Sequence, residues 1–129
     1  CSRATEFARY IDALDDEHFV ACLDLGHCGL IGEEAEDAIR ILGHDRLKAL
    51  HVHDNDYRSD MHTLPFLQNM NWDAIMKALA DIRYDGDFTF EADNFLSHFP
   101  NDFKPRAVKF MVDTGRYLIG MYDKHLANS

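Results

Sequence analysis

Histidine and acidic side chains are concentrated between residues 51 and 62. His51 and His53 stand at the end of an apolar segment that starts at Leu47, and Asp60 and His62 follow shortly after. Residues two apart on a β-strand project from the same face, about 6.6 Å apart along the strand. Imidazole and carboxylate groups are typical ligands of divalent metal ions. The pattern predicts a divalent metal site where a buried strand ends. The alternative is a polar loop whose histidines are ordinary core or surface residues.

Two more apolar segments of strand length end in such side chains. The run Phe19–Leu25 is too short for a helix and contains Asp24 near its end, and the run Phe88–Glu91 ends in Glu91. Parallel strands have their C-terminal ends at one edge of a sheet, so we expect Asp24, His51 and Glu91 to converge. The alternative for Asp24 and Glu91 is a role as helix N-caps or turn residues.

Helices are predicted between these strands. Thr5 can cap a first helix, and a second is expected over residues 33–42 with Gly43 as its C-terminal cap. A third follows the cap residue Asn71, and the last runs over residues 102 to about 125. Alternating helices and strands favour a parallel sheet with right-handed crossovers. Functional groups at the ends of successive parallel strands are typical of a (β/α)8 barrel, so we predict an α/β fold with about three parallel strands.

The bulk composition favours one globular domain. The chain has 129 residues, of which 47% are apolar and 28% charged. Thirteen Lys and Arg against 23 Asp and Glu leave a formal net charge of −10, which disfavours nucleic acid as a partner. No apolar run is long enough to span a membrane and no signal peptide opens the chain, so no membrane association is expected. Three cysteines without a CxxC pair indicate reduced thiols and a cytoplasmic location, with a disulfide as the alternative.

Four segments together resemble the xylose isomerase-like TIM-barrel superfamily of sugar isomerases, epimerases and endonuclease IV. They are Cys22–His27, His51–Asn55, Ser59–Pro65 and Tyr84–Glu91. Their order and spacing are similar to the last three strands of that barrel, and the likeness runs through nearly the whole chain. The resemblance implies that residues 1–129 are a partial domain, the C-terminal half of a (β/α)8 TIM barrel, because a full barrel needs about 250 residues.

The resemblance also implies roles for seven residues. Asp24, His51 and Glu91 would ligate one divalent metal ion (Mn, Mg, Co or Zn), and a glutamate on a preceding strand is the family's usual fourth ligand. His51 is preferred to its competitor two residues later because the family pattern places the ligand three residues before an acidic residue, here Asp54. A second metal is the alternative role for His27. The expected substrate-binding residues are His27, His53, Asp60 and His62.

The activity implied by the resemblance is metal-dependent isomerisation or epimerisation of a sugar or sugar-like polyol by proton transfer through an enediolate. Glu91 would be one of two catalytic carboxylates, and this chain alone is expected to lack the other glutamate. The alternatives are an endonuclease IV-like metal-dependent phosphodiesterase and a non-catalytic half-barrel. A small-molecule sugar is the expected partner. Three parallel strands leave an open edge, at the strand Phe19–Leu25, and an uncovered apolar face, so the chain is expected to be a homo-oligomer or a fragment of a longer chain.

Overall fold

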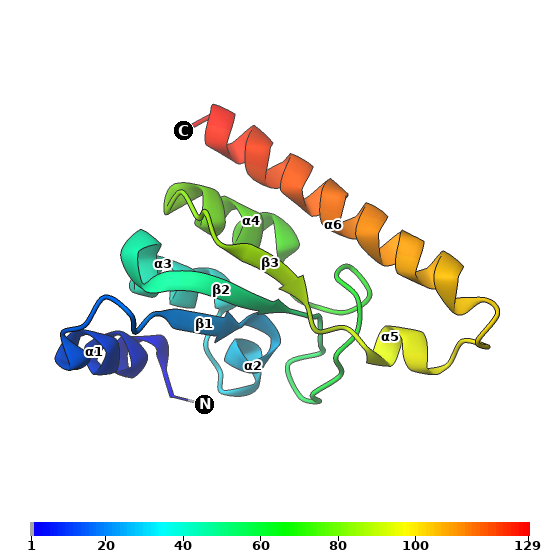
Figure 1. The fold of residues 1–129 in the computed structure, drawn as a ribbon, viewed down its shortest axis with the longest axis horizontal. Helices are drawn as coiled ribbons and strands as arrows, with labels where there is room; N and C mark the ends of the chain where they lie inside the picture. Colours follow the sequence, from blue (N-terminus) through cyan, green and yellow to red (C-terminus); the bar gives the residue numbers. More distant parts are fainter. Residues whose placement is uncertain (1) are drawn as a thin grey trace.

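The structure, a computed structural model, describes residues 2–129. Three strands, β1 (Ala21–Asp24), β2 (Leu47–Val52) and β3 (Asp87–Phe90), form one parallel sheet in the order β1-β2-β3 (Figure 1). The helices are α1 (Ala4–Leu14), α2 (Leu25–Leu30), α3 (Ala35–Arg46), α4 (Trp72–Asp81), α5 (Asn94–Ser97) and α6 (Lys104–Ala127). The predicted α/β fold with three parallel strands and alternating helices is confirmed.

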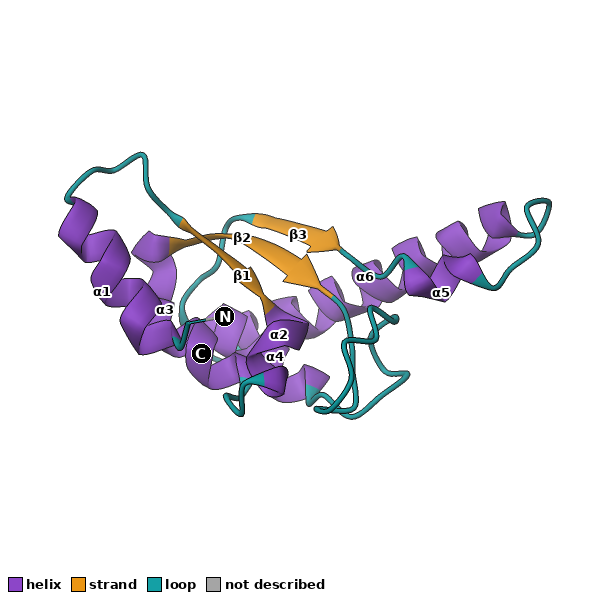
Figure 2. Cartoon of the chain, turned by 90° about the horizontal axis from the view of Figure 1, so that it is seen from below, coloured by secondary structure: helices purple, strands orange, loops and turns teal. Residues whose placement is uncertain are grey.

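The helices lie on one side of the sheet, as Figure 2 shows. The helices α1, α3, α4 and α6 pack against one another in this order. Their apolar faces meet the buried side chains of the strands, because alternate residues of a strand share a face. The core therefore lies between the sheet and a single layer of helices. Its fully buried side chains include Leu25, Ile39, Leu42, Leu47, Leu50, Val52, Ile75, Met76, Leu79 and Leu118.

The other face of the sheet carries small and polar side chains. Cys22, Ala49, His51, Asp87 and Thr89 alternate with the core-facing strand residues, and none of these five is buried. The expectation of an uncovered apolar face is wrong, because this barrel-facing side of the sheet is largely polar. Large exposed apolar side chains lie elsewhere, and those on α6 are Val108, Phe110, Val112, Tyr117 and Ile119.

The start of the first helix differs from the expectation. Thr5 does not cap α1, because the helix already begins at Ala4 and Arg3 occupies the cap position without a side-chain hydrogen bond. The Ala4 N–H donates instead to Glu33 Oε2 at 3.0 Å. A carboxylate from a distant segment therefore replaces the local cap that the sequence pattern indicated.

Two other predicted helix ends behave as expected. The side-chain oxygen of Asn71 accepts the Ala74 N–H at 3.2 Å and caps α4. Gly43 has φ 71° and interrupts the helical conformation of α3 before its final turn. The sequence patterns do not predict the short helices α2 and α5. None of the helices in the described residues, not even the 24-residue α6, has the apolar character that a bilayer-spanning segment needs.

Both outer strands have a free edge within residues 2–129, because β1 and β3 each pair with β2 alone. The prediction that the strand ending at Asp24 lies at an open parallel edge is confirmed. An open edge offers unpaired backbone N–H and C=O groups to another strand.

We expect the 129-residue chain, expressed alone, to associate, most simply as a two-fold dimer. Two open edges and the exposed apolar side chains of α6 would otherwise remain in water. Leaving apolar surface in water forgoes a free energy of about 25 cal/mol per Å². Sedimentation equilibrium should give about twice the mass of one chain. Val112→Asp on α6 should shift the chain toward the monomer, whereas Tyr10→Asp, at an exposed position of α1, should not. A wild-type chain that sediments as a monomer and melts cooperatively would contradict this expectation.

Candidate functional site

Three side chains meet where the strands end, on the uncovered face of the sheet. The register pairs Asp24 with His51 and His51 with Thr89, and Glu91 directly follows β3. His51 Nδ1 lies 3.2 Å from Glu91 Oε2 and 4.0 Å from Asp24 Oδ2. The side chains of His51 and Glu91 are 45% and 41% exposed, so solutes can reach them. The structure thus brings together the three residues that the family resemblance implied as ligands.

The two carboxylate oxygens of Asp24 have different partners. Oδ1 accepts the backbone N–H of His27 at 2.9 Å, which caps α2, and it lies 2.9 Å from His53 Nε2. Oδ2 faces the site and lies 3.0 Å from His27 Nδ1. Burial acts to raise the pKa of Asp24, but the hydrogen bonds from His53 and the His27 N–H, with the nearby imidazoles, lower the pKa to about 2. The helix-cap role and a role in the site therefore belong to different oxygens of one side chain.

His53 is completely buried behind Asp24. Because Asp24 is ionised, His53 Nε2 carries the proton of their hydrogen bond, and His53 Nδ1 has no hydrogen-bond partner among residues 2–129. Gly26 leaves room for the ring, because a Cβ at position 26 would lie 2.0 Å from His53 Cε1. His53 thus orients one oxygen of Asp24 and leaves the other directed at the site.

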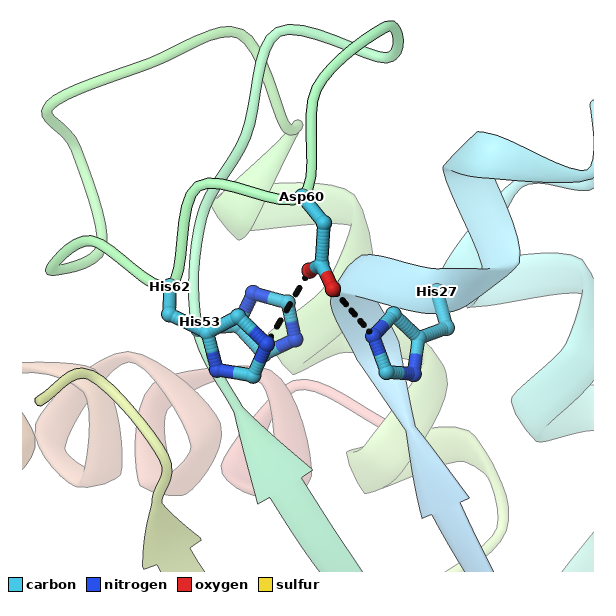
Figure 3. A group of neighbouring side chains, drawn as sticks. All are labelled: His27, His53, Asp60 and His62. Carbon is cyan, nitrogen blue, oxygen red and sulfur yellow. Dashed lines mark hydrogen bonds and ion pairs between the residues drawn. The ribbon is translucent and has the colours of Figure 1, made fainter. Parts of the chain in front are cut away.

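A second group of side chains comes from α2 and from the loop between β2 and α4 (Figure 3). Asp60 stands between two histidines, with Oδ2 3.1 Å from His27 Nε2 and Oδ1 3.0 Å from His62 Nε2. The ring of His62 stacks on that of His53, with 4.1 Å between the centroids and 6° between the planes. The loop therefore delivers Asp60 and His62 to the same place as the first group.

His62 presents Nε2 to Asp60 because its other nitrogen is engaged. Its Nδ1–H donates to the Glu91 carbonyl oxygen at 2.9 Å, which selects the tautomer. Burial acts to lower the pKa of His62, but the Glu91 carbonyl and the carboxylates of Asp60 and Glu91 outweigh it, so the pKa is raised. An Nε2 lone pair that faces a carboxylate is repelled by it. The arrangement therefore suits a proton or a metal cation between the two groups.

Two sets of side chains have ligand atoms within 4.8 Å of one another, close enough to share a cation. One set is Asp24, His53 and Glu91, and the other is His27, His53, Asp60 and His62. His51 adjoins the first set through its short distances to Glu91 and Asp24. All seven residues identified from the sequence thus lie in one cluster, which contains both the preferred ligand His51 and its competitor His53.

Two features of the site are missing from the sequence-based predictions. One is the space that Gly26 leaves for His53. The other is Asp54, a fully buried carboxylate that accepts Trp72 Nε1–H at 2.9 Å. The sequence marks Asp54 only as an acidic residue after an apolar strand, and its partner is 18 residues away. The one sequence feature that indicates such an acceptor is Trp72 at the start of a helix, because a buried indole N–H usually has a hydrogen-bond partner.

A cleft of about 490 Å³ opens beside Glu91 and His62. Phe90, Leu96 and Met111 form much of its apolar lining, and none of the described residues that line it is Lys or Arg. An anionic ligand would meet the carboxylates of Glu91 and Asp93 there, and His62 is the one described lining residue that can carry a compensating positive charge. With no Lys or Arg beside it, this lining favours a neutral polar molecule over a phosphorylated one.

Comparison with known proteins identifies the family. A family model described as "Xylose isomerase-like TIM barrel" matches residues 1–114. The chain belongs to this family. The resemblance inferred from four short segments of the sequence is thereby confirmed.

Two known proteins indicate how much of such a domain this xylose isomerase-like chain contains. The uncharacterised protein y4fM of Sinorhizobium fredii (strain NBRC 101917 / NGR234) is 38% identical over 85 residues, which cover 66% of this chain and 27% of that protein. The crystal structure of a D-tagatose 3-epimerase-like protein matches with a TM-score of 0.66 at 15% identity, over 91% of this chain and 42% of that one. The chain thus spans about a quarter of the first and less than half of the second. The second likeness concerns the fold and agrees with the predicted partial barrel.

We expect Asp24 to make the stability of this xylose isomerase-like chain depend on acid pH. The pKa of Asp24 is about 2 in the folded chain, against about 3.9 in an unfolded one, so the ionised carboxylate stabilises the fold. This contribution, on the order of 2 kcal/mol, is complete above about pH 4 and is lost as the pH falls through about 2. Asp24→Asn should lack it. Denaturant midpoints of both proteins between pH 5 and 2 provide the measurement, and equal pH slopes would contradict the expectation.

Proposed function

We propose that this chain forms the metal-binding half of an isomerase or epimerase that acts on a sugar or sugar-like polyol by moving a proton beside a carbonyl group. The observation that carries the proposal is the meeting of Asp24, His51 and Glu91 at the ends of three neighbouring parallel strands. Catalytic groups of TIM-barrel enzymes come from the C-terminal ends of several strands. The structural relative is itself named D-tagatose 3-epimerase-like, which agrees with this class of reaction.

The donor set of the site fits a divalent cation. Asp24, His51 and Glu91 would hold it, and mixed carboxylate and imidazole ligation suits Mn, Mg, Co or Zn. His53 supports this assignment, because it binds Asp24 Oδ1 and leaves Oδ2 directed at the site. When bound, the cation would polarise a substrate carbonyl and stabilise negative charge that develops beside it.

Glu91 is the proton-transfer group in this proposal. Its carboxylate is partly exposed at the cleft, and its Oε2 neighbours His51. Such a group can remove a carbon-bound proton from one face of a substrate and return it to the same face. Inversion requires a second acid–base group on the opposite face, which we place outside these 129 residues. His27, Asp60 and His62 would bind substrate hydroxyl groups.

An endonuclease IV-like phosphodiesterase that uses more than one metal ion is a second candidate. The observation in its favour is the convergence of His27, Asp60 and His62, whose ligand atoms could hold a further cation. The net charge of −10 and the absence of Lys and Arg from the described lining of the cleft count against a nucleic-acid substrate. The third candidate is a non-catalytic half-barrel that binds a metal or a partner.

We expect the chain, supplied with Mn²⁺ in D2O, to exchange the proton beside the carbonyl of at least one ketose in a small panel without inverting that carbon. Glu91 alone suffices for removal and return of the proton on one face. Glu91→Gln should lower the exchange rate about 10²–10⁴-fold, the usual contribution of a general base. Loss of the substrate proton signal in the NMR spectrum measures the rate.

Asp87→Asn is the matched control for this experiment. Asp87 is an exposed carboxylate at the opposite end of β3, and its replacement should leave the exchange within about twofold, as expected for a surface change remote from the site. Nicking of abasic DNA without ketose exchange would replace the proposal with the phosphodiesterase. A chain that performs neither reaction would support the non-catalytic half-barrel.

We expect His51→Ala to abolish metal retention and His53→Ala to leave most of it. The His51 ring faces the site between two carboxylates, whereas His53 contacts Asp24 from behind. Loss of a residue that orients a ligand costs about 10–100-fold in metal affinity, which still leaves a tight site largely occupied. Metal analysis of the two purified variants after dialysis provides the comparison. The opposite ranking would assign the ligand role at this strand end to His53.

A further inference from the structure

The loop over residues 54–71 carries Asp60 and His62 in a backbone conformation that needs support. Tyr57, His62 and Phe66 have positive φ angles of 64°, 44° and 77°. Residues with side chains rarely adopt this left-handed region, so each of the three costs folding free energy. Contacts elsewhere in the loop must therefore hold it in this shape, and the strongest of them should lie where the loop closes.

The loop closes on the carboxylate of Asp54, which is fully buried. Its Oδ1 accepts the backbone N–H groups of Asn55 and Met70 at 2.8 and 3.2 Å. Its Oδ2 accepts the N–H of Gln68 at 3.2 Å and Trp72 Nε1–H at 2.9 Å. One side chain thus binds the start of the loop, its end and the first turn of α4. Four N–H donors compensate the burial of its charge.

The backbone of Asp54 also fixes His62, through hydrogen bonds to the next residue, Thr63. The Asp54 N–H donates to the Thr63 carbonyl at 2.8 Å, and the Thr63 N–H donates to the Asp54 carbonyl at 3.4 Å. This antiparallel bridge lies one residue after His62. It therefore fixes the direction in which the side chain of His62 projects from the backbone, toward Asp60 and His53.

Asn55 connects the same loop to the segment that carries His27. Asn55 is fully buried, its Nδ2 donates to the Gly26 carbonyl at 2.7 Å, and its Oδ1 accepts the Tyr57 N–H at 3.0 Å. Gly26 immediately precedes His27 in α2. The loop and α2 are thus tied together one residue away from the histidine that faces Asp60.

We propose that Asp54 is the positioning residue of this cluster: its buried carboxylate ties the two ends of the loop together and thereby places Asp60 and His62 against His27. The placement follows from the contacts above, whereas the role of the placed residues toward a substrate rests on the function proposed in the previous section. An amide cannot replace the carboxylate, because it has one acceptor oxygen and its NH2 group would face two N–H donors.

The test is limited trypsin digestion together with histidine side-chain NMR. In Asp54→Asn, cleavage of the exposed Arg58–Ser59 bond should accelerate about tenfold or more, because hydrogen bonds to a buried charged group are lost. Cleavage after Arg9 in α1 should remain within about twofold of the wild-type rate and serves as the internal reference. Long-range ¹H–¹⁵N spectra should show His62 protonated at Nδ1 in the wild type and averaged between tautomers in the variant.

Asp56→Asn is the matched control, because it removes the same charge from the same loop. Asp56 accepts the N–H groups of Arg58 and Ser59 through one oxygen, which asparagine keeps. Its cleavage rate at Arg58 and its His62 signals should match the wild type. Trp72→Phe removes only the Nε1–H donor and should accelerate the cleavage at Arg58 by a smaller factor. This variant tests the proposal if Asp54→Asn does not fold.

Wild-type cleavage at Arg58 and unchanged His62 signals in a folded Asp54→Asn variant would overturn the proposal. Equal acceleration after Arg9 and Arg58 would also overturn it, because the effect would then be a loss of global stability. Neither readout uses turnover or a metal ion. A failure of the proposed enzymatic function therefore stays distinguishable from a failure of this inference.

Discussion

The cluster depends on the parallel pairing of β2 with a strand on each side. Within the described residues, β2 is hydrogen-bonded along both of its edges, and its register sets Asp24 level with His51. Carboxylates repel one another, so backbone hydrogen bonding and not side-chain attraction brings Asp24 and Glu91 to the same imidazole. Leu50 and Val52 on the buried side of β2 hold the strand against the helices. Burial of apolar surface on one side of the sheet therefore offsets the electrostatic repulsion between the carboxylates on the other side.

Much of this arrangement can be predicted from the sequence because it follows from local rules. Strand alternation, helical periodicity and the acids at strand ends are all expressed within a few neighbouring residues. The cap at Asn71 is predictable for the same reason, since the groups it joins are three residues apart. A strand order of β1-β2-β3 then follows from the handedness of the crossovers.

The remaining features depend on residues that are distant in sequence. Thr5 has the right chemistry for a cap, yet Glu33 reaches the helix start from 29 residues away. Strand periodicity places His51 and His53 on the same face, and the packing against Gly26 and Asp24 makes one ring buried and the other open. Patterns of composition and period do not encode such contacts, so the difference in burial between the two histidines is visible only in the structure.

The distribution of polarity over the sheet limits where another protein surface can pack against this chain. The uncovered face of the sheet bears Cys22, His51 and Thr89, so it offers little apolar surface to a second protein layer. The apolar side chains that remain exposed, Val112 and Ile119 among them, lie on the outer helix α6. Within the described residues, the surfaces open to such packing are therefore the sheet edges and this helix.

The close approach of Gly26 to His53 has a consequence for sequence variation. The ring occupies the volume that a Cβ at position 26 would need, so the two positions divide one space between them. A side chain at 26 is compatible only with a smaller residue at 53, and each replacement alone is more harmful than the pair together. Positions 26 and 53 should therefore change in step among relatives. A relative with alanine at 26 should lack the buried imidazole that orients Asp24. Another hydrogen-bond donor must then hold that carboxylate in place.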